Sequence, residues 1–273
     1  MKIKLISAFF ILTATCMFAQ SNKISLDSEK QKTSYNKNFS VSPKTGVSFE
    51  KDKIIIAPKY EDVEYVLTGY FNGQIVNRTK GTILKLKNAY IENSKGEPAI
   101  LCEAKTEISS TKDTKNWIVS TGTVEAKNGA VQSKKKLVFG GSGEMYVIGN
   151  VYHAVKGDDV KLKGSGDFYF EGTAKGSGIN CSTFTVELEK SFKAYFLNSK
   201  NGIKADSTIS IASGNFYLSD LETGMKTDTT SENPSKPHGI SISGGLIRYA
   251  RLTDVFKTDQ NALKTNGGKI QQM

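Results

Sequence analysis

The chain has few of the residues that support metal or nucleophilic chemistry. Its 273 residues include two histidines and three cysteines. His153 and His238 lie far apart, and neither has a second ligand at the spacing typical of a zinc site. The sequence also lacks a serine-nucleophile elbow, and its Gly-Ser-Gly turns precede expected strands rather than the helix that a nucleotide-binding loop requires. We therefore expect no metal site, no cofactor and no catalytic residue of these classes.

Long apolar runs are also scarce, and the one at the start is short. Lys2 and Lys4 precede a predominantly apolar stretch, residues 5–18, which the small residue Ala19 follows. This order predicts a secretory signal peptide, residues 1–19, that is cleaved after Ala19. A membrane-spanning helix needs about 20 apolar residues, so we expect no transmembrane segment. The mature chain is then secreted, periplasmic or displayed at the cell surface.

A repeat organises most of the mature chain. One column pairs a small residue with an apolar one, at Ala99-Ile100, Ala130-Val131, Ala154-Val155, Gly178-Ile179, Gly202-Ile203, Gly224-Met225 and Ala262-Leu263. From Ala130 the steps are 24, 24, 24 and 22 residues. Two further columns alternate apolar and polar residues with the period of a β-strand, starting at Leu137 and Met145.

Three short strands per repeat cannot bury an apolar face alone, whereas stacked coils can. The sequence therefore predicts an all-β fold, a single-stranded parallel β-helix wound as a right-handed solenoid of about 22–26 residues per coil. We assign it to residues 51–273, after a polar linker or N-terminal cap at residues 20–50. A β-sandwich is the alternative, but it needs hairpins, for which the chain has few turn sequences.

The repeat also bears on the two mature cysteines. Cys102 and Cys181 each stand three residues after the small residue of the first column. They fall three coils apart, which at about 4.8 Å per coil is roughly 14 Å. A disulfide tolerates at most about 7 Å between Cα atoms. We expect two free, buried thiols.

An aromatic row is the first candidate binding surface. One tyrosine stands in the middle of each strand of the third column, at Tyr146, Tyr169, Tyr195 and Tyr217, and its apolar neighbours face inward. Outward rings one coil apart would form a flat strip that contacts the apolar faces of sugar rings. The alternative is an aromatic ladder that only stabilises the sheet.

A basic row is the second candidate. Lys156, Lys204, Lys226 and Lys264 follow the small-apolar column, with Asn180 in register. The formal net charge of +10 agrees with an anionic ligand, and for an exported protein an acidic glycan is a better candidate than nucleic acid. A solvated, aggregation-resistant edge is the alternative reading. Asp158, Asp206 and Asp228 follow three lysines of the set by two residues, and a carboxylate pair such as Asp206 and Asp228 is what glycoside hydrolysis and calcium binding both need. The alternative is that these aspartates are turn residues.

Several segments resemble a family of secreted bacterial proteins described as carbohydrate-binding domain-containing. The resemblance begins at Tyr65-Val66-Leu67-Thr68-Gly69 and continues through residues 84–94, Pro98-Ala99-Ile100 and Gly141-Ser142-Gly143, then through residues 149–155 and Asn201-Gly202-Ile203-Lys204. It covers roughly residues 60 to 250 and implies sugar binding.

These observations predict an exported, non-catalytic module that binds a glycan or polysaccharide, including an anionic one, or another cell-surface partner. The expected ligand-binding residues are Tyr146, Tyr169, Tyr195, Tyr217, Lys156, Lys204 and Lys226. The first alternative is a polysaccharide-active enzyme, a lyase or hydrolase that uses Asp206 and Asp228. The second is a structural or adhesin protein, because fold alone does not determine function.

Overall fold

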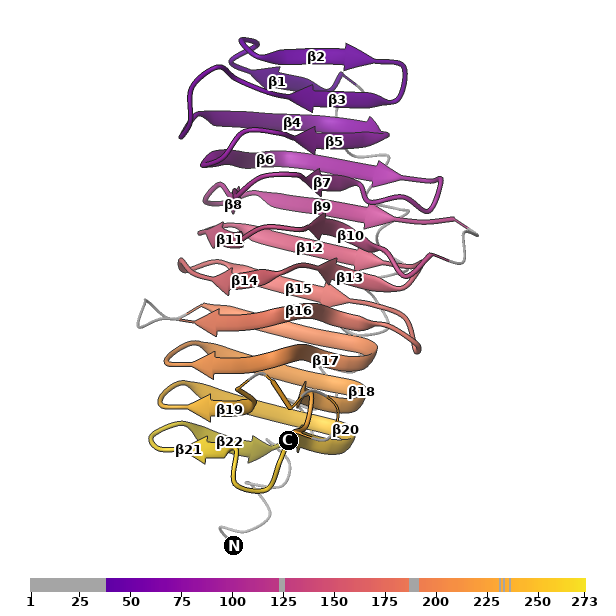
Figure 1. Cartoon of the computed structure of the whole chain (residues 1–273). Helices are drawn as coiled ribbons and strands as arrows, with labels where there is room; N and C mark the ends of the chain where they lie inside the picture. Colours follow the sequence, from indigo (N-terminus) through magenta and orange to yellow (C-terminus); the bar gives the residue numbers. More distant parts are fainter. Residues whose placement is uncertain (1–37, 123–125, 187–191, 231, 233, 236) are drawn as a thin grey trace, which may run out of the picture.

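The computed structural model describes residues 38–122, 126–186, 192–230, 232, 234–235 and 237–273, which form an all-β structure (Figure 1). The predicted signal peptide, residues 1–19, lies outside the described residues, as does the part of the expected linker before residue 38. No helix in the described part of the chain has the length and apolar character needed to cross a membrane.

Most strands fall into three rows of parallel neighbours. The first row contains β3 (Lys53–Ile56), β5 (Gln74–Asn77), β7 (Ile100–Cys102), β10 (Gly129–Ser133) and β13 (His153–Lys156). The second contains β8 (Thr106–Ser110), β11 (Leu137–Gly141), β14 (Asp159–Leu162), β19 (Gly239–Ile242) and β21 (Leu263–Thr265). The third contains β9 (Lys115–Ser120), β12 (Glu144–Gly149), β15 (Asp167–Glu171) and β22 (Lys269–Gln272).

Six longer strands bend through more than one row. We call one passage of the chain through the rows a rung. In a rung that contains such a strand, the strand continues from one row to the next without a break. They are β4 (Glu64–Asn72), β6 (Thr82–Asn93), β16 (Ser177–Val186), β17 (Lys193–Ile211), β18 (Asn215–Thr227) and β20 (Leu246–Lys257). The two strands inside the expected cap, β1 (Ser40–Ser42) and β2 (Val47–Glu50), pair antiparallel with β4 and β3.

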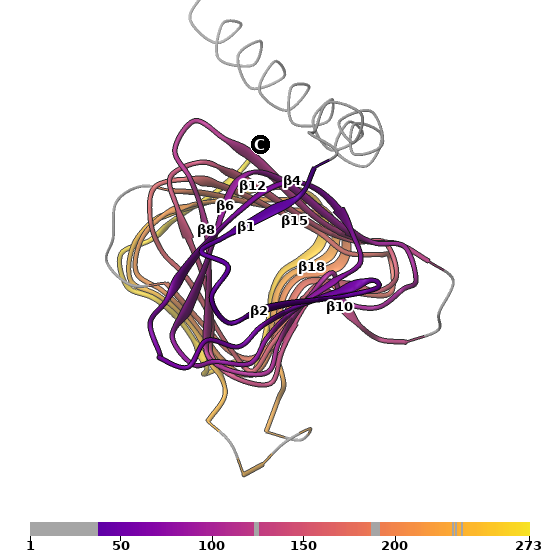
Figure 2. The same ribbon diagram turned by 90° about the horizontal axis from the view of Figure 1, so that it is seen from above.

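The chain is all-β, as predicted, but the predicted architecture, a single-stranded parallel β-helix wound as an open solenoid, is wrong. Hydrogen-bonded neighbours close a parallel barrel of nine strands, and the other strands lie outside it. The ring runs from β6 through β8, β11, β14, β16, β17, β15, β12 and β9 back to β6. It closes because β6 and β17 belong to two or more rows at once, and Figure 2 shows the strands enclosing a common interior.

The register of the first column agrees with the pairing as far as Met225. Val131 lies opposite Val155, Ile179 opposite Ile203, and Ile203 opposite Met225. Ala262-Leu263 does not continue this column, because Leu263 lies in the second row opposite Ile240. The side chain stacked after Met225 is Phe256. The predicted column is wrong at this position because the long segment between β18 and β19 shifts the spacing of the repeat.

The hydrophobic core is built from buried side chains of all three rows. Phe168, Phe170, Phe196 and Phe216 are fully buried there with the aliphatic residues of the columns. Cys102 and Cys181 are free and buried in the same core, as predicted. Burial raises the pKa of the Cys102 thiol to about 12, so this thiol stays protonated.

One corner of the sheet depends on stacked glycines. Gly141, the last residue of β11, and Gly164, in the turn after β14, both have positive φ, at 101° and 94°. A Cβ on Gly164 would stand 2.4 Å from the carbonyl oxygen of Gly141. The backbones of successive rungs therefore approach each other here too closely for any side chain.

Candidate functional site

The four predicted tyrosines lie in register in the third row. Tyr146 is opposite Tyr169, Tyr169 opposite Tyr195, and Tyr195 opposite Tyr217. Their ring centroids are separated by 4.3, 4.5 and 4.6 Å, and the planes of neighbouring rings differ by 12° or less. The rings therefore stack face to face along the molecule.

The stack extends at both ends beyond the predicted residues. Trp117 stacks on Tyr146 with a centroid distance of 4.1 Å, and Tyr90 and Tyr70 continue the row. At the other end the Arg248 guanidinium lies 5.5 Å from the centroid of the Tyr217 ring and donates a 2.9 Å hydrogen bond to its hydroxyl. This aromatic ladder is the set Tyr70, Tyr90, Trp117, Tyr146, Tyr169, Tyr195 and Tyr217.

The ladder exposes little ring surface. Tyr146 and Tyr169 are 8% and 5% exposed, and Tyr195 and Tyr217 are half-buried. Burial is the main cause that raises the pKa of Tyr146, Tyr169 and Tyr195 well above the ordinary value of a phenol. Because each inner ring has a neighbour on both faces, its faces cannot also stack on a sugar. The ligand-binding role of the tyrosines stays a prediction, and their geometry favours a stabilising role.

The predicted lysines lie in register in the first row. Lys156 is opposite Asn180, Asn180 opposite Lys204, and Lys204 opposite Lys226. The next position is Lys257, which lies opposite Lys226 and was not predicted. Lys264, expected here, lies in the second row opposite Ser241. The sequence signal for Lys257 was its position directly after the apolar Phe256 and two residues after Val255. The long segment before β19 obscured this signal because it shifts the spacing of the repeat.

The lysine row forms one wall of a groove with a volume of about 420 Å³. The lining also includes Tyr152, Lys175, Lys200, Glu222 and Lys127. In the described part of the lining, seven residues are lysines and Glu222 is the one carboxylate. The wall from Lys156 to Lys257 spans four steps of about 4.8 Å, or roughly 19 Å. We call this feature the lysine groove.

Polar side chains form the floor of the lysine groove. They are His153, Ser177, Asn201 and Thr223, and each is 7% exposed or less. The Ser177 amide donates a 3.0 Å bond to His153 Nδ1, and Asn201 Nδ2 donates a 3.2 Å bond to Ser177 Oγ. The floor is therefore fixed by its own hydrogen bonds and lines the groove with polar groups.

The charge of the groove is only partly compensated. Lys200 pairs with Glu222 at 3.8 Å, Lys204 with Asp228 at 3.6 Å, and Lys226 with Glu232 at 3.5 Å. These pairs are long and partly exposed, so each contributes little. An anion that entered the groove would meet an excess of positive charge.

The predicted carboxylate pair lies outside the groove. Asp206 lies in β17 and Asp228 directly follows β18, where the Asp228 amide donates to the Ala205 carbonyl. Neither residue lines the lysine groove, and Asp228 pairs with Lys204. No group of three metal-ligating side chains occurs within the residues described.

Three comparisons with known proteins bear on this chain. The model of a family described as "Carbohydrate-binding domain-containing protein" matches residues 51–184. No curated protein matches the chain. Among solved structures, a polysaccharide lyase-like protein from C. thermocellum aligns with a TM-score of 0.56 at 16% identity, covering 82% of this chain and 92% of its own.

The structural likeness, at this low identity, shows a shared fold and nothing more. The family match overlaps β3 to β15 and the first half of the lysine groove, including Lys156 and Asn180. It contains most of the motifs on which the resemblance was predicted. The match of the family model over residues 51–184 confirms the predicted resemblance to carbohydrate-binding domain-containing proteins.

Proposed function

We propose that the protein is an exported, non-catalytic carbohydrate-binding module that holds an acidic polysaccharide in the lysine groove. The observation that carries this proposal is the gathering of seven lysines in one groove that has a hydrogen-bonded polar floor. Lysine ammonium groups attract carboxylates or sulfates, and the floor groups match sugar hydroxyls, which both donate and accept hydrogen bonds.

The shape of the groove favours a linear ligand. The lysine wall is straight because its members repeat once per rung in β13, β16, β17, β18 and β20. A length of roughly 19 Å is that of several sugar residues rather than one. The polymer would lie parallel to the stack of rungs, with anionic groups facing the lysine row and hydroxyls facing the floor.

Binding without catalysis agrees with the chemistry of the groove floor. Burial, together with Lys156, Lys204 and Lys127, lowers the pKa of His153 to about 3. A general base works best with a pKa near the working pH. His153 Nδ1 also accepts the Ser177 amide, so that nitrogen is already used. The imidazole of the groove is therefore better suited to holding the floor than to removing a proton.

The test compares acidic and neutral polymers. Binding of polygalacturonate, alginate, dextran and starch to the purified protein is measured by titration calorimetry at low and high salt. We expect binding of an acidic polymer that weakens steeply as salt screens the lysines. A triple variant, Lys156→Gln/Lys204→Gln/Lys226→Gln, should bind at least about tenfold more weakly.

The matched control removes the same charge elsewhere. Lys87, Lys112 and Lys136 are exposed and lie outside the groove, so Lys87→Gln/Lys112→Gln/Lys136→Gln should bind as the wild type does. If both triple variants bound the acidic polymer equally weakly, binding would be a nonspecific effect of charge and not a property of the groove. Unsaturated products in the same mixtures would identify a lyase instead, and no binding to any polymer would favour a structural or adhesin role.

A further inference from the structure

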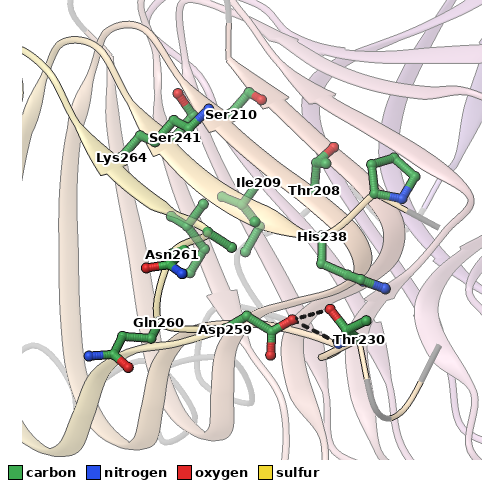
Figure 3. A pocket seen from close by; sticks show the side chains of 14 residues that line it. Thr208, Ile209, Ser210, Thr230, His238, Ser241, Asp259, Gln260, Asn261 and Lys264 are labelled. Carbon is green, nitrogen blue, oxygen red and sulfur yellow. Dashed lines mark hydrogen bonds between the residues drawn. The ribbon is translucent and has the colours of Figure 1, made fainter. Parts of the chain in front are cut away.

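A second cavity, of about 740 Å³, lies over the second row near β19 and β21. Its strand wall carries Thr208, Ser210 and Ser241, and the side is closed by Thr230, Pro237 and His238 before β19 and by residues 259–262 before β21 (Figure 3). It shares no lining residue with the lysine groove.

The two closing segments are tied together at one carboxylate. Asp259 Oδ2 accepts a 2.8 Å bond from the Thr230 amide and a 2.5 Å bond from the Thr230 hydroxyl. These bonds lower the pKa of Asp259, which keeps the carboxylate ionised. Because both bonds end on Oδ2, the orientation of the group is fixed and Oδ1 can accept a hydrogen bond from a ligand.

The remaining polar groups match hydroxyls rather than charges. Ser210, Ser241 and Lys264 lie opposite one another in successive strands, and Asn261 and Gln260 present amides from the other side. Hydroxyl and amide groups donate and accept hydrogen bonds, as sugar hydroxyls do. Lys264 and Asp259 balance in charge, in contrast to the seven lysines of the groove.

We propose that this cavity is a second binding site, which takes an uncharged sugar. Asp259 Oδ1 would accept from one or two ring hydroxyls, the strongest class of hydrogen bond available to a neutral sugar. The serine row and Asn261 would bond the others, and Pro237 and Ala262 supply apolar contact to the ring. An ionised sugar would be disfavoured by the Asp259 carboxylate.

The experiment uses the whole purified protein and four probes: glucose, galactose, mannose and glucuronate. Affinities are measured by ligand-detected NMR for the wild type, Asp259→Asn, Asn261→Ala and the control Asp113→Asn, whose carboxylate lies on an exposed turn. We expect one neutral sugar to bind, glucuronate to bind more weakly than glucose, and Asp259→Asn to weaken binding about tenfold.

Asn261→Ala keeps the tether between Asp259 and Thr230, so weaker binding in this variant is not explained by an opened cavity. The triple lysine variant of the groove should bind the neutral sugar as the wild type does, which separates the two sites. The proposal is overturned if none of the neutral sugars binds, if glucuronate binds as well as glucose, or if Asp259→Asn and Asn261→Ala both leave the affinity unchanged.

Discussion

The aromatic ladder and the lysine row of the groove are both built from side chains that repeat along successive rungs, but the two kinds of stacking have opposite effects on stability. In each, one side chain per rung stacks on its equivalent in the next strand. Stacked rings attract, each pair contributing about 0.5–1.5 kcal/mol beyond burial. Ammonium groups on adjacent strands repel, as Lys204, Lys226 and Lys257 must. The ladder stabilises the fold, whereas the lysine row is tolerated at some cost, which points to a ligand.

The largest expected effect comes from removing a ring from the middle of the ladder. Tyr169 stacks on Tyr146 and Tyr195 and is 5% exposed. Tyr169→Ala should lower the free energy of unfolding by about 3–5 kcal/mol, as large-to-small changes of buried aromatics do. Chemical denaturation measures this, with Tyr60→Ala as the exposed control, since Tyr60 is 71% exposed.

The same variant sharpens the comparison with the groove. While it remains folded, Tyr169→Ala should bind acidic polymer with wild-type affinity, because the ladder and the groove lie in different rows. Loss of binding in a folded Tyr169→Ala protein, established by circular dichroism, would restore the tyrosines as ligand contacts and contradict the assignment of binding to the lysines.

A smaller, pH-dependent effect is expected at Glu171, which lies beside the ladder in β15. Burial raises its pKa to about 7, and Asn198 Nδ2 donates a 3.1 Å hydrogen bond to its Oε1. Its Oε2 is buried without a hydrogen-bond partner among the described residues. A raised pKa means that the folded state binds the Glu171 proton more tightly than the unfolded state does. The stability that this proton contributes is complete below about pH 4.5 and is lost as the pH rises to about 7.

Glu171→Gln should therefore stabilise the protein at pH 8 by up to about 3 kcal/mol relative to the wild type, and by little at pH 4. Denaturation across this pH range gives the difference between the two proteins at each pH, which cancels other titrating groups. A difference that does not change between pH 4 and pH 8 would show that the Glu171 pKa is ordinary.

How far the sequence predicted these two regions depends on where the repeat is regular. Tyr146 to Tyr217 and Lys156 to Lys226 were predicted because their steps stay near 24 residues. Trp117 and Tyr90 were missed because register shifts in β4–β6 pairing and loops of unequal length hide the column. Lys257 was missed for the same reason, after the long segment between β18 and β19.

The closure of the nine-strand barrel and the burial of the ladder were not predictable from spacing. β17 runs through all three rows in 19 residues without a break, whereas alternation of apolar residues suggested separate short strands. Spacing also shows that rings face outward from the core, but not how much of each ring its neighbours cover. Burial depends on contacts between residues distant in sequence, and such contacts produce no periodic pattern in the sequence.

A modest effect is expected from relieving repulsion in the groove. Lys257 is exposed and lies opposite Lys226. Lys257→Gln should raise the free energy of unfolding by a few tenths of a kcal/mol at low salt, and the gain should vanish at high salt. Lys87→Gln, at an exposed position of β6 outside the lysine groove, is the control. A gain that persists at high salt would indicate a cause other than charge.

The smallest effect is spectroscopic and concerns the groove floor. Because burial and the surrounding lysines lower the pKa of His153 to about 3, its imidazole should stay neutral across the physiological range. Its contribution to stability is complete above about pH 6.5 and is lost as the pH falls toward 3. NMR titration of the imidazole carbons should show no inflection between pH 5 and 8.

In the triple variant that lacks Lys156 and Lys204, two of the repelling charges are gone, so the pKa of His153 should rise while burial still keeps it below its ordinary value. An unchanged pKa there would mean that burial alone sets it, and that the lysines act too far from the floor to orient a ligand bound on it.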